Sequence, residues 1–335
     1  MDKNSGKKID LATICFGEEL GLLALQARSV RLYMDQAVLG TIHLVVNDKN
    51  FTQIEKHIRT HILPEYGGLA SRVRIYSYFA LTNNMRIKKL GWRSQQALKL
   101  LISQHIENPT YLILDSKNHF IRAVAAANFW QTDGRLKIAP TPIYKRFMND
   151  YIQARRYFGL PEIGRVNEGS VISGTKEPAW PAVTPFPVAA ALVRKMIETL
   201  EQSQKKSFIE IFMKGPRVTE FYLLYAYLEA AYGGFVQFYA AAPRTSFPLM
   251  ASTAGAPKKV DDIIAKLAAP DVICFGVHRT VLQAKNPAIL QSIAAIWQRY
   301  GLVESEAEAQ RFLVAMPLSG RDRFWHRIWR RFWIF

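Results

Sequence analysis

Short apolar runs alternate with segments of helical spacing through the first 115 residues. The strand-like runs occupy residues 11–16, 41–46, 73–79 and 111–114. Between them, residues 18–33, 51–62 and 92–106 carry apolar side chains at the spacing of a helix. Strands that alternate with helices predict an α/β fold with a mostly parallel central sheet and helices on both faces. Ligands of such sheets bind beyond the carboxyl ends of the strands, so we expect functional residues just after these runs.

The second half of the chain has a less regular pattern. It predicts helices at 188–200, 219–232 and 286–300, with Thr219 as the N-cap of the second. Strands are expected at 208–213, 235–239 and 272–276, and a long mobile loop at 240–257. Residues 128–187 are rich in proline, glycine and aromatic residues and show few clear elements. No linker divides the chain, so we expect a single domain at 1–318 followed by a tail at 319–335.

Composition limits the classes of partner. Of 335 residues, 49% are hydrophobic and 21% are charged, which excludes wholesale disorder. Lys and Arg number 44 against 27 Asp and Glu, a net charge of +17 that favours nucleotide phosphates, nucleic acid or an acidic membrane surface. The two cysteines lie in apolar runs, which argues against a disulfide scaffold or a cysteine zinc site. Without a secretory signal or an apolar run of about 18 residues, we expect a cytoplasmic chain.

The fourth strand leads directly into a polar sequence, DSKNH, at 115–119. A carboxylate at the end of a buried strand needs a partner, and Asp115 can find one in a metal, a sugar hydroxyl or a basic side chain. If the chain stays extended, Asp115, Lys117 and His119 share one face. The alternative interpretation is that Asp115 caps a turn.

The preceding helix supports a ligand site. Trp92, Gln96 and Lys99 fall on one helical face, and Gln95 lies four residues before Lys99. Glutamine and lysine side chains beside a strand-end aspartate suit a ligand that has both hydroxyls and phosphates. The alternative is a solvated polar face. Further cations stand just before this helix or at its start, and some of them are expected to meet the phosphates: Arg86, Lys88, Lys89 and Arg93.

These segments also resemble a known group. The runs GWRSQQALKLL and YLILDSKNHFIR resemble an uncharacterised bacterial group of GT-A-type glycosyltransferases. In that group a G-W-x-x-Q-Q-x-x-K-L helix precedes a strand that ends in Asp-Ser/Ala-Asp/Lys. Two later motifs also match, the helix start TEF at 219–221 with Tyr225 one turn on, and the strand end VHR at 277–279. The resemblance covers roughly residues 10–300 in order.

The resemblance implies a GT-A-like nucleotide-diphospho-sugar transferase fold. It also implies a glycosyltransferase that takes a nucleotide-sugar donor and acts on a glycan or lipid-linked acceptor, in surface polysaccharide synthesis. Donor contacts are expected at the strand ends, on the 92–106 helix and at the late strand end. The expected donor-binding residues are Phe16, Gly17, Asn47, Asp48, Arg86, Trp92, Gln95, Gln96, Lys99, Asp115, Ser116, Lys117 and His278.

One departure from the GT-A pattern bears on metal use. GT-A enzymes commonly hold the donor diphosphate through Asp-x-Asp and a divalent cation, whereas the third position here is Lys117. A lysine repels Mg²⁺ or Mn²⁺ but neutralises phosphate charge itself, which favours a metal-independent transferase. Alternatively, Asp115 ligates a cation together with His119 or His278, because carboxylate and imidazole both suit Mn²⁺. In a third interpretation the site has lost catalysis and only binds.

Glu220 is the candidate general base, and with Asp115 it forms the predicted catalytic set. A sugar hydroxyl that attacks an anomeric carbon must lose a proton, which a positioned carboxylate accepts. The helix start favours the Glu220 anion and lowers its basicity, whereas burial acts in the opposite direction. Direct displacement with inversion follows if Glu220 is the base. The alternative is an ordinary glutamate in a first helical turn.

The last 15 residues, RDRFWHRIWRRFWIF, combine five arginines with three tryptophans. Helical spacing puts the aromatic residues on one face and most arginines on the other, which is typical of a helix lying in an anionic membrane interface. Residues 321–335 therefore predict a peripheral protein on the inner face of the membrane; the alternative is packing on the protein itself or on a second subunit. A catalytically inactive glycan-binding or membrane-assembly protein is the other function considered. Specific nucleic-acid binding lacks any recognition motif.

Overall fold

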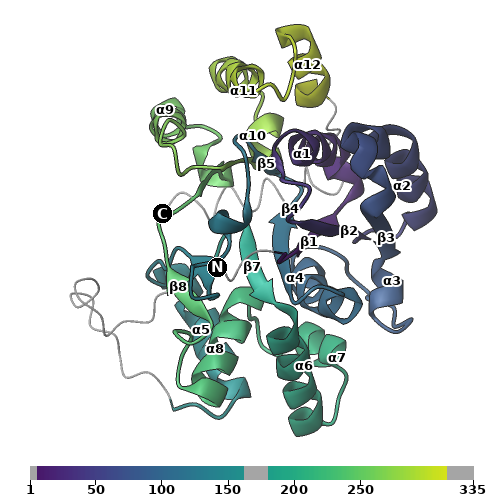
Figure 1. The fold of residues 1–335 in the computed structure, drawn as a ribbon. Helices are drawn as coiled ribbons and strands as arrows, with labels where there is room; N and C mark the ends of the chain where they lie inside the picture. Colours follow the sequence, from purple (N-terminus) through teal and green to yellow (C-terminus); the bar gives the residue numbers. More distant parts are fainter. Residues whose placement is uncertain (1–5, 162–179, 315–335) are drawn as a thin grey trace.

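A five-stranded sheet forms the centre of the computed structural model, which describes residues 6–161 and 180–314 (Figure 1). The strand order is β3-β2-β1-β4-β7, and the first four strands are parallel while β7 is antiparallel to β4. The strands are β1 (Ile9–Cys15), β2 (Leu39–Val46), β3 (Val73–Ser77), β4 (Thr110–Asp115) and β7 (Phe186–Ala189). The predicted α/β architecture with a mostly parallel sheet is confirmed.

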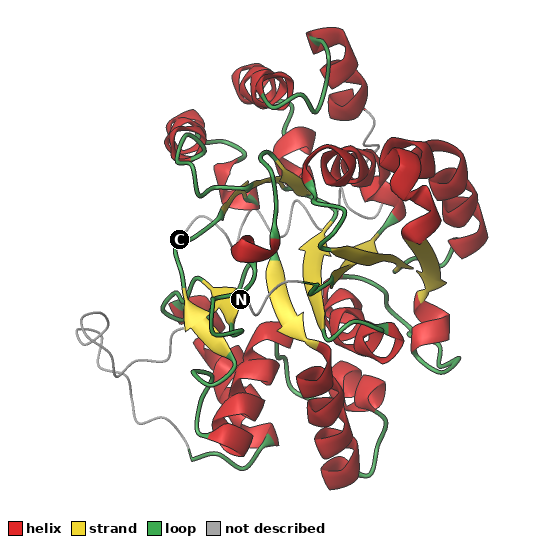
Figure 2. Cartoon of the chain, viewed as in Figure 1, coloured by secondary structure: helices red, strands yellow, loops and turns green. Residues whose placement is uncertain are grey.

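Helices cover both faces of this sheet (Figure 2). On one face lie α1 (Leu20–Tyr33) and α2 (Phe51–His57), the latter continued by a π-helical turn, Ile58–Ile62. On the other lie α4 (Trp92–Leu101) and α6 (Ala190–Gln204), with α7 (Phe208–Lys214) and α8 (Glu220–Tyr232) packed against α4 and α6. The short α3 (Tyr78–Leu81) follows β3, and α5 (Lys145–Tyr157) packs on α8.

A second apolar cluster lies on the outer side of α1. Leu23 and Ala27 of α1 face the central sheet, whereas Leu22 and Leu25 join the second cluster. That cluster holds a small sheet of order β5-β10-β9, formed by β5 (Asn118–Phe120), β9 (Ser246–Leu249) and β10 (Cys274–Val277). Its helices are α9 (Pro257–Lys266), α10 (Arg279–Gln283), α11 (Pro287–Arg299) and α12 (Glu306–Val314). Because α1 is apolar on two sides, it connects the two clusters.

A two-stranded sheet completes the described fold. It pairs β6 (Leu136–Ile138) with β8 (Tyr239–Ala241) in parallel. The 3₁₀ segments are Gly17–Glu19, Leu63–Arg72, Ile102–His105, Ala126–Asn128 and Ala251–Thr253. Within the described ranges, no helix is both long and apolar enough to cross a bilayer. The predicted membrane-binding tail at 321–335 lies outside the described residues.

Element predictions were accurate in the first half of the chain and less so in the second. The strand expected at 208–213 is wrong, because this run forms α7. Ser207 donates to Glu210 at 3.1 Å in its first turn, a side-chain pair that favours helix over strand. The strand expected at 235–239 begins only at Tyr239, after Gly233 and Gly234 turn the chain with φ of 71° and 140°. The loop expected at 240–257 contains β9, which forms by pairing with the distant β10.

Candidate functional site

The carboxyl ends of β1, β2 and β4 lie next to one another in the sheet. Cys15 pairs with Val46 of β2, and Ile14 pairs with Asp115 of β4. The residues that follow these strands therefore meet at one edge, as the strand pattern predicts. Gly17 and Asp48 are close neighbours there, since a Cβ added at Gly17 would lie 3.4 Å from the Asp48 carboxylate.

Asp115 is held between two lysines. Its Oδ1 lies 2.7 Å from the Lys99 Nζ, and its Oδ2 forms an ion pair with Lys117 and accepts from the Thr184 hydroxyl at 3.0 Å. The side chains of Asp115 and Lys117 remain 17% and 14% exposed, whereas that of Lys99 is 3% exposed. Burial alone raises the pKa of the Asp115 carboxyl, but Lys117 and Lys99 outweigh it and hold that pKa well below its usual value. The group is therefore a carboxylate at neutral pH.

Behind Asp115 lies a buried ion pair between α4 and α8. The Lys99 Nζ lies 3.0 Å from Oε1 of Glu220, whose side chain is 1% exposed. With its amide nitrogen turned toward Glu220, Gln96 also donates to this carboxylate, at 3.2 Å from Oε1. Burial lowers the pKa of Lys99, but the two carboxylates raise it above its usual value. Burial raises the pKa of Glu220 and Lys99 opposes that change, so the net shift is upward.

Glu220 reaches this position because Thr219 starts α8. The Thr219 hydroxyl accepts from the Tyr222 amide at 3.1 Å, which confirms the predicted N-cap. Nearly the whole first half of α8 is buried, so its first side chain is directed into the protein. In the structure the Glu220 carboxylate therefore binds Lys99 and is closed to solvent.

A tight turn at Ser116 and Lys117 separates β4 from β5. The Asp115 amide donates to Oδ1 of Asn118 at 2.8 Å, and Gln26 of α1 donates to the Asp115 carbonyl at 2.8 Å. The expectation that Asp115, Lys117 and His119 share a face is wrong, because the chain turns instead of staying extended. Ser116 is fully buried in this turn.

His119 points away from Asp115 into the second apolar cluster. Its ring centroid lies 6.2 Å from that of Phe275 and 5.9 Å from that of Trp297. Burial lowers the pKa of His119 to about 3, so the ring is neutral at physiological pH. His278 caps α10, where its Nδ1 lies 2.8 Å from the Thr280 hydroxyl. The predicted metal set of Asp115, His119 and His278 is therefore not assembled, and His119 is a core residue.

The start of α4 is fixed by contacts that the sequence pattern did not indicate. Asn47 donates to the Gly91 carbonyl at 3.1 Å and accepts from the Ser94 hydroxyl at 2.9 Å. Gln95 is directed toward β1, where it donates to the Ile14 carbonyl at 3.4 Å. Asn47 and Gln95, expected to contact the donor, are 1% and 9% exposed as whole residues, and their side chains bond to the protein backbone and to Ser94.

The cations expected around this helix have different positions. Arg93 donates to the carbonyls of Phe212 and Gly215 at the end of α7, so it is a structural residue and not a phosphate ligand. Trp92 is 47% exposed. The Arg217 guanidinium lies 6.0 Å from a Trp92 ring centroid. Arg86 is exposed on the loop before α4 and forms no ion pair with any residue in the described ranges.

Two residues of the site, Glu19 and Thr184, were missed in the sequence. Glu19 follows β1, and Asp115 and Lys117 are near enough to shift its pKa. Burial raises that pKa; Arg279, whose guanidinium lies 3.9 Å from Glu19, opposes the change without cancelling it. The acidic pair after Gly17 was a usable signal for Glu19. Thr184 lies in an irregular segment, and no sequence pattern marked it as a site residue.

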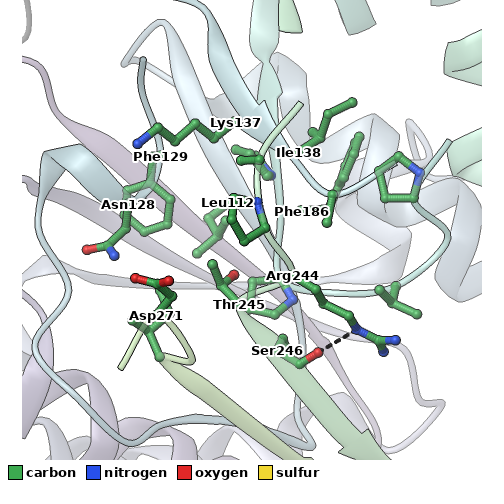
Figure 3. A pocket seen from close by; sticks show the side chains of 18 of the residues that line it. Leu112, Asn128, Phe129, Lys137, Ile138, Phe186, Arg244, Thr245, Ser246 and Asp271 are labelled. Atoms are coloured by element: carbon green, nitrogen blue, oxygen red, sulfur yellow. Dashed lines mark hydrogen bonds between the residues drawn. The ribbon is translucent and has the colours of Figure 1, made fainter. Parts of the chain in front are cut away.

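A cavity of about 370 Å³ lies beside this cluster (Figure 3). It is bounded by β4, β7, the β9 start and the β6–β8 sheet, and Asp115 and Lys117 are not among its lining residues. Thr184 stands between its lining residues Val183 and Pro185, so one short segment contacts both the cavity and the Asp115 carboxylate.

A family model matches residues 16–256, which is more than half of the chain. The chain belongs to DUF6492, a family of unknown function. No curated protein matches it. The structure of this DUF6492 chain is similar to the galactosyltransferase LgtC, solved with donor and acceptor sugar analogs, at 12% identity and a TM-score of 0.43 over 94% of this chain and 99% of that one.

Two further solved structures are similar. Mouse xyloside xylosyltransferase 1 in its apo form gives 12% identity and a TM-score of 0.41, over 80% of this chain and 97% of that chain. The glycosyltransferase GlyE of Streptococcus pneumoniae TIGR4 gives 11% identity and a TM-score of 0.42, over 92% of this chain and 62% of that chain. TM-scores of this size do not assign an activity, so the function is argued from the side chains of the DUF6492 site.

The side chains of the site do not fit a divalent cation. Asp115 already has a lysine ammonium paired with each of its carboxylate oxygens. A positive charge in direct contact with the carboxylate repels a metal ion that would bind there. Within residues 6–161 and 180–314, no three His, Cys, Asp or Glu side chains are grouped to hold a metal. The arrangement instead presents one carboxylate and one partly exposed ammonium, Lys117, at the carboxyl edge of the sheet.

Proposed function

We propose that the chain is a glycosyltransferase that moves a sugar from a nucleotide-sugar donor to a glycan or lipid-linked acceptor without a metal ion. The observation that carries this proposal is the Asp115–Lys117 pair, partly exposed at the carboxyl end of a buried parallel strand and supported from behind by Lys99. The sequence motifs that resemble GT-A transferases include these same residues. A role in surface polysaccharide synthesis follows from that resemblance.

Lys117 supplies the positive charge that a donor pyrophosphate requires. During transfer the acceptor oxygen attacks the anomeric carbon, the bond from that carbon to the phosphate oxygen breaks, and the nucleoside diphosphate leaves with the electron pair. An ammonium placed at the leaving oxygens stabilises the developing charge. Asp115 orients Lys117 through their ion pair.

The proton of the acceptor hydroxyl needs a carboxylate with access to the site. Glu220 is 1% exposed and bonded to Lys99, so we assign it the positioning of Lys99. Glu19 keeps 15% side-chain exposure, and its raised pKa makes it a better base than an ordinary glutamate. We therefore propose Glu19 as the proton acceptor of a direct, inverting displacement. The pH dependence of kcat tests this role. In the wild type kcat should fall at acidic pH as Glu19 becomes protonated, and this fall should be absent in Glu19→Gln.

Thermal shift with nucleoside diphosphates tests donor binding. A ligand that binds only the folded state raises the melting temperature, by an amount that grows with its concentration relative to Kd. The ligands to test are UDP, GDP, CDP and ADP, each with and without Mn²⁺. We expect at least one of them to raise the melting temperature of the wild type, and we expect this shift without Mn²⁺. Absence of a shift with all four contradicts the proposal, and a shift strictly dependent on Mn²⁺ contradicts its metal-free form.

We further propose that the enzyme works peripherally at the inner face of the membrane through residues 321–335. The support is sequence composition alone, because five arginines each contribute about 1 kcal/mol near an anionic surface. The full chain should sediment with vesicles containing phosphatidylserine and remain free with phosphatidylcholine vesicles. A chain that ends at 318 should lose this binding, and equal sedimentation of the two chains contradicts the proposal.

One observation favours a second function, a non-catalytic glycan-binding protein. Both carboxylate oxygens of Asp115 are already paired, which leaves that side chain less available than a free catalytic carboxylate. This alternative predicts that donors bind without turnover. Release of nucleoside diphosphate from any nucleotide sugar by the wild type excludes it.

A further inference from the structure

The 370 Å³ cavity has the size and the mixed lining of a small-ligand site. Apolar side chains form one part of its wall, among them Phe129, Ile138 and Phe186. Polar side chains surround them: Asn128, Lys137, Thr141, Arg244, Thr245 and Asp271. In Figure 3, Asn128 and Asp271 lie on one side of the cavity and Arg244 on the other. Such a lining suits a sugar ring, which has apolar faces and a rim of hydroxyls.

Arg244 is a partly buried cation that has no acidic partner among the described residues. Its Nε donates to the Ser246 carbonyl at 2.8 Å, and its guanidinium carbon lies 4.8 Å from the Phe247 ring centroid. No carboxylate of residues 6–161 or 180–314 lies within ion-pair distance of it. Burial lowers the pKa of Arg244, which reflects the cost of keeping this charge away from water. An anion that enters the cavity would remove part of that cost by pairing with the guanidinium.

The cavity is connected to the Asp115 cluster by hydrogen bonds. Thr184 donates from its hydroxyl to Asp115 Oδ2 at 3.0 Å, and its carbonyl accepts from the Ser246 hydroxyl at 3.4 Å. Ser246 itself lines the cavity, as do Val183 and Pro185 on either side of Thr184. Residues 183–185 therefore border the cavity and also hold the Asp115 carboxylate, which places the cavity next to the proposed donor site.

We propose that this cavity is the acceptor subsite and that it takes a sugar bearing an anionic group, which pairs with Arg244. The proposal rests on the glycosyl transfer proposed above. The carboxylate of a uronic acid and the phosphate of a sugar phosphate are the two sources of the same negative charge. Lys137 adds to the positive charge of the cavity, and the single acidic side chain among its lining residues is Asp271.

Saturation-transfer NMR on the full chain tests this assignment with four probes. Methyl β-D-glucuronide and glucose 6-phosphate carry the two anionic groups, methyl β-D-glucoside is the uncharged comparison, and inorganic phosphate is the anion alone. We expect at least one anionic sugar to bind more tightly than the glucoside and than phosphate. Arg244→Gln should weaken that binding by about tenfold or more, because hydrogen bonds to charged groups are lost. Arg244→Lys should keep part of it.

A matched control is Arg299→Gln, since Arg299 also lies over an aromatic ring, 5.7 Å from the Tyr300 centroid, but on the distant α11. It should leave sugar binding unchanged, and all variants should retain the wild-type circular dichroism. The subsite is overturned if the glucoside or phosphate alone binds as tightly as the anionic sugars. It is also overturned if neither anionic sugar binds, or if a folded Arg244→Gln binds them as tightly as the wild type does. Thermal shift by nucleoside diphosphates separates the two proposals: if it persists while anionic sugars fail to bind, only the subsite is wrong.

Discussion

Replacement of Lys99 by methionine tests whether one buried ammonium neutralises two carboxylates. The Lys99 Nζ lies 2.7 Å from Asp115 and 3.0 Å from Glu220, and its side chain is 3% exposed. Methionine fills a similar volume without charge. Asp115 keeps Lys117, but Glu220, at 1% exposure, loses its cationic partner and keeps neutral contacts such as the Gln96 amide. Removal of one member of a buried pair costs about 3–5 kcal/mol, so we expect Lys99→Met to lower the free energy of unfolding by that amount at pH 7.

The pH dependence of this loss follows from Glu220. Burial raises the pKa of Glu220 and Lys99 lowers it, so without Lys99 the pKa rises further. A carboxyl whose folded pKa is raised contributes stability below its unfolded pKa and loses that contribution as pH rises through the folded pKa. The difference between wild type and Lys99→Met should therefore be smallest near about pH 5 and grow toward about pH 8.

Urea denaturation followed by tryptophan fluorescence at these pH values measures the effect. Lys258→Met is the matched control, because Lys258 is exposed on α9, and it should change stability by less than about 0.5 kcal/mol. Addition of Glu220→Gln to Lys99→Met should recover about 1–3 kcal/mol, since the unpaired carboxylate is then gone. A Lys99→Met loss below about 1 kcal/mol that does not vary with pH would refute the buried ion pair.

The remaining predictions address the same site. Lys117→Met should weaken nucleoside diphosphate binding by about tenfold or more in calorimetry, because a charge-assisted contact to phosphate is removed; unchanged affinity would place the phosphates elsewhere. Thr184→Val should leave the fold intact and lower kcat more than it changes donor KM, since it removes the hydrogen bond that orients Asp115; an effect on KM alone argues against an orienting role. Thr219→Ala should lower the free energy of unfolding by about 1 kcal/mol through loss of the α8 N-cap, and a loss close to zero in denaturant titration would contradict that cap.

Local pattern predicted the scaffold of the site because it depends on short-range signals. The first four strands of the sheet and α1 were predicted within a few residues, and parallel strands necessarily place Asp115 beside the end of β1. The helical spacing of Gln96 and Lys99 also correctly pointed at the Asp115 cluster. The apolar run at 208–213 was misassigned because a short apolar segment has no decisive period.

Burial and direction of side chains were not predictable from the same pattern. Whether a first-turn glutamate such as Glu220 faces solvent or a lysine depends on how α8 packs against α4, which is a tertiary contact. The direction of His119 depends on a turn that is tied to Gln26 of α1, 92 residues away from Asn118. Thr184 reaches Asp115 only because β7 pairs with β4. These contacts are long-range, so no local signal indicated them.

Release of nucleoside diphosphate from nucleotide sugars tests the central claim most directly. A panel of UDP-, GDP-, CDP- and ADP-sugars should include at least one that the wild type turns over. Asp115→Asn, which keeps the shape of the side chain but loses the charge that holds Lys117, should lower this rate by about 100-fold or more while the protein stays folded. Equal rates for the wild type and a folded Asp115→Asn, or no turnover of any donor, would contradict the account.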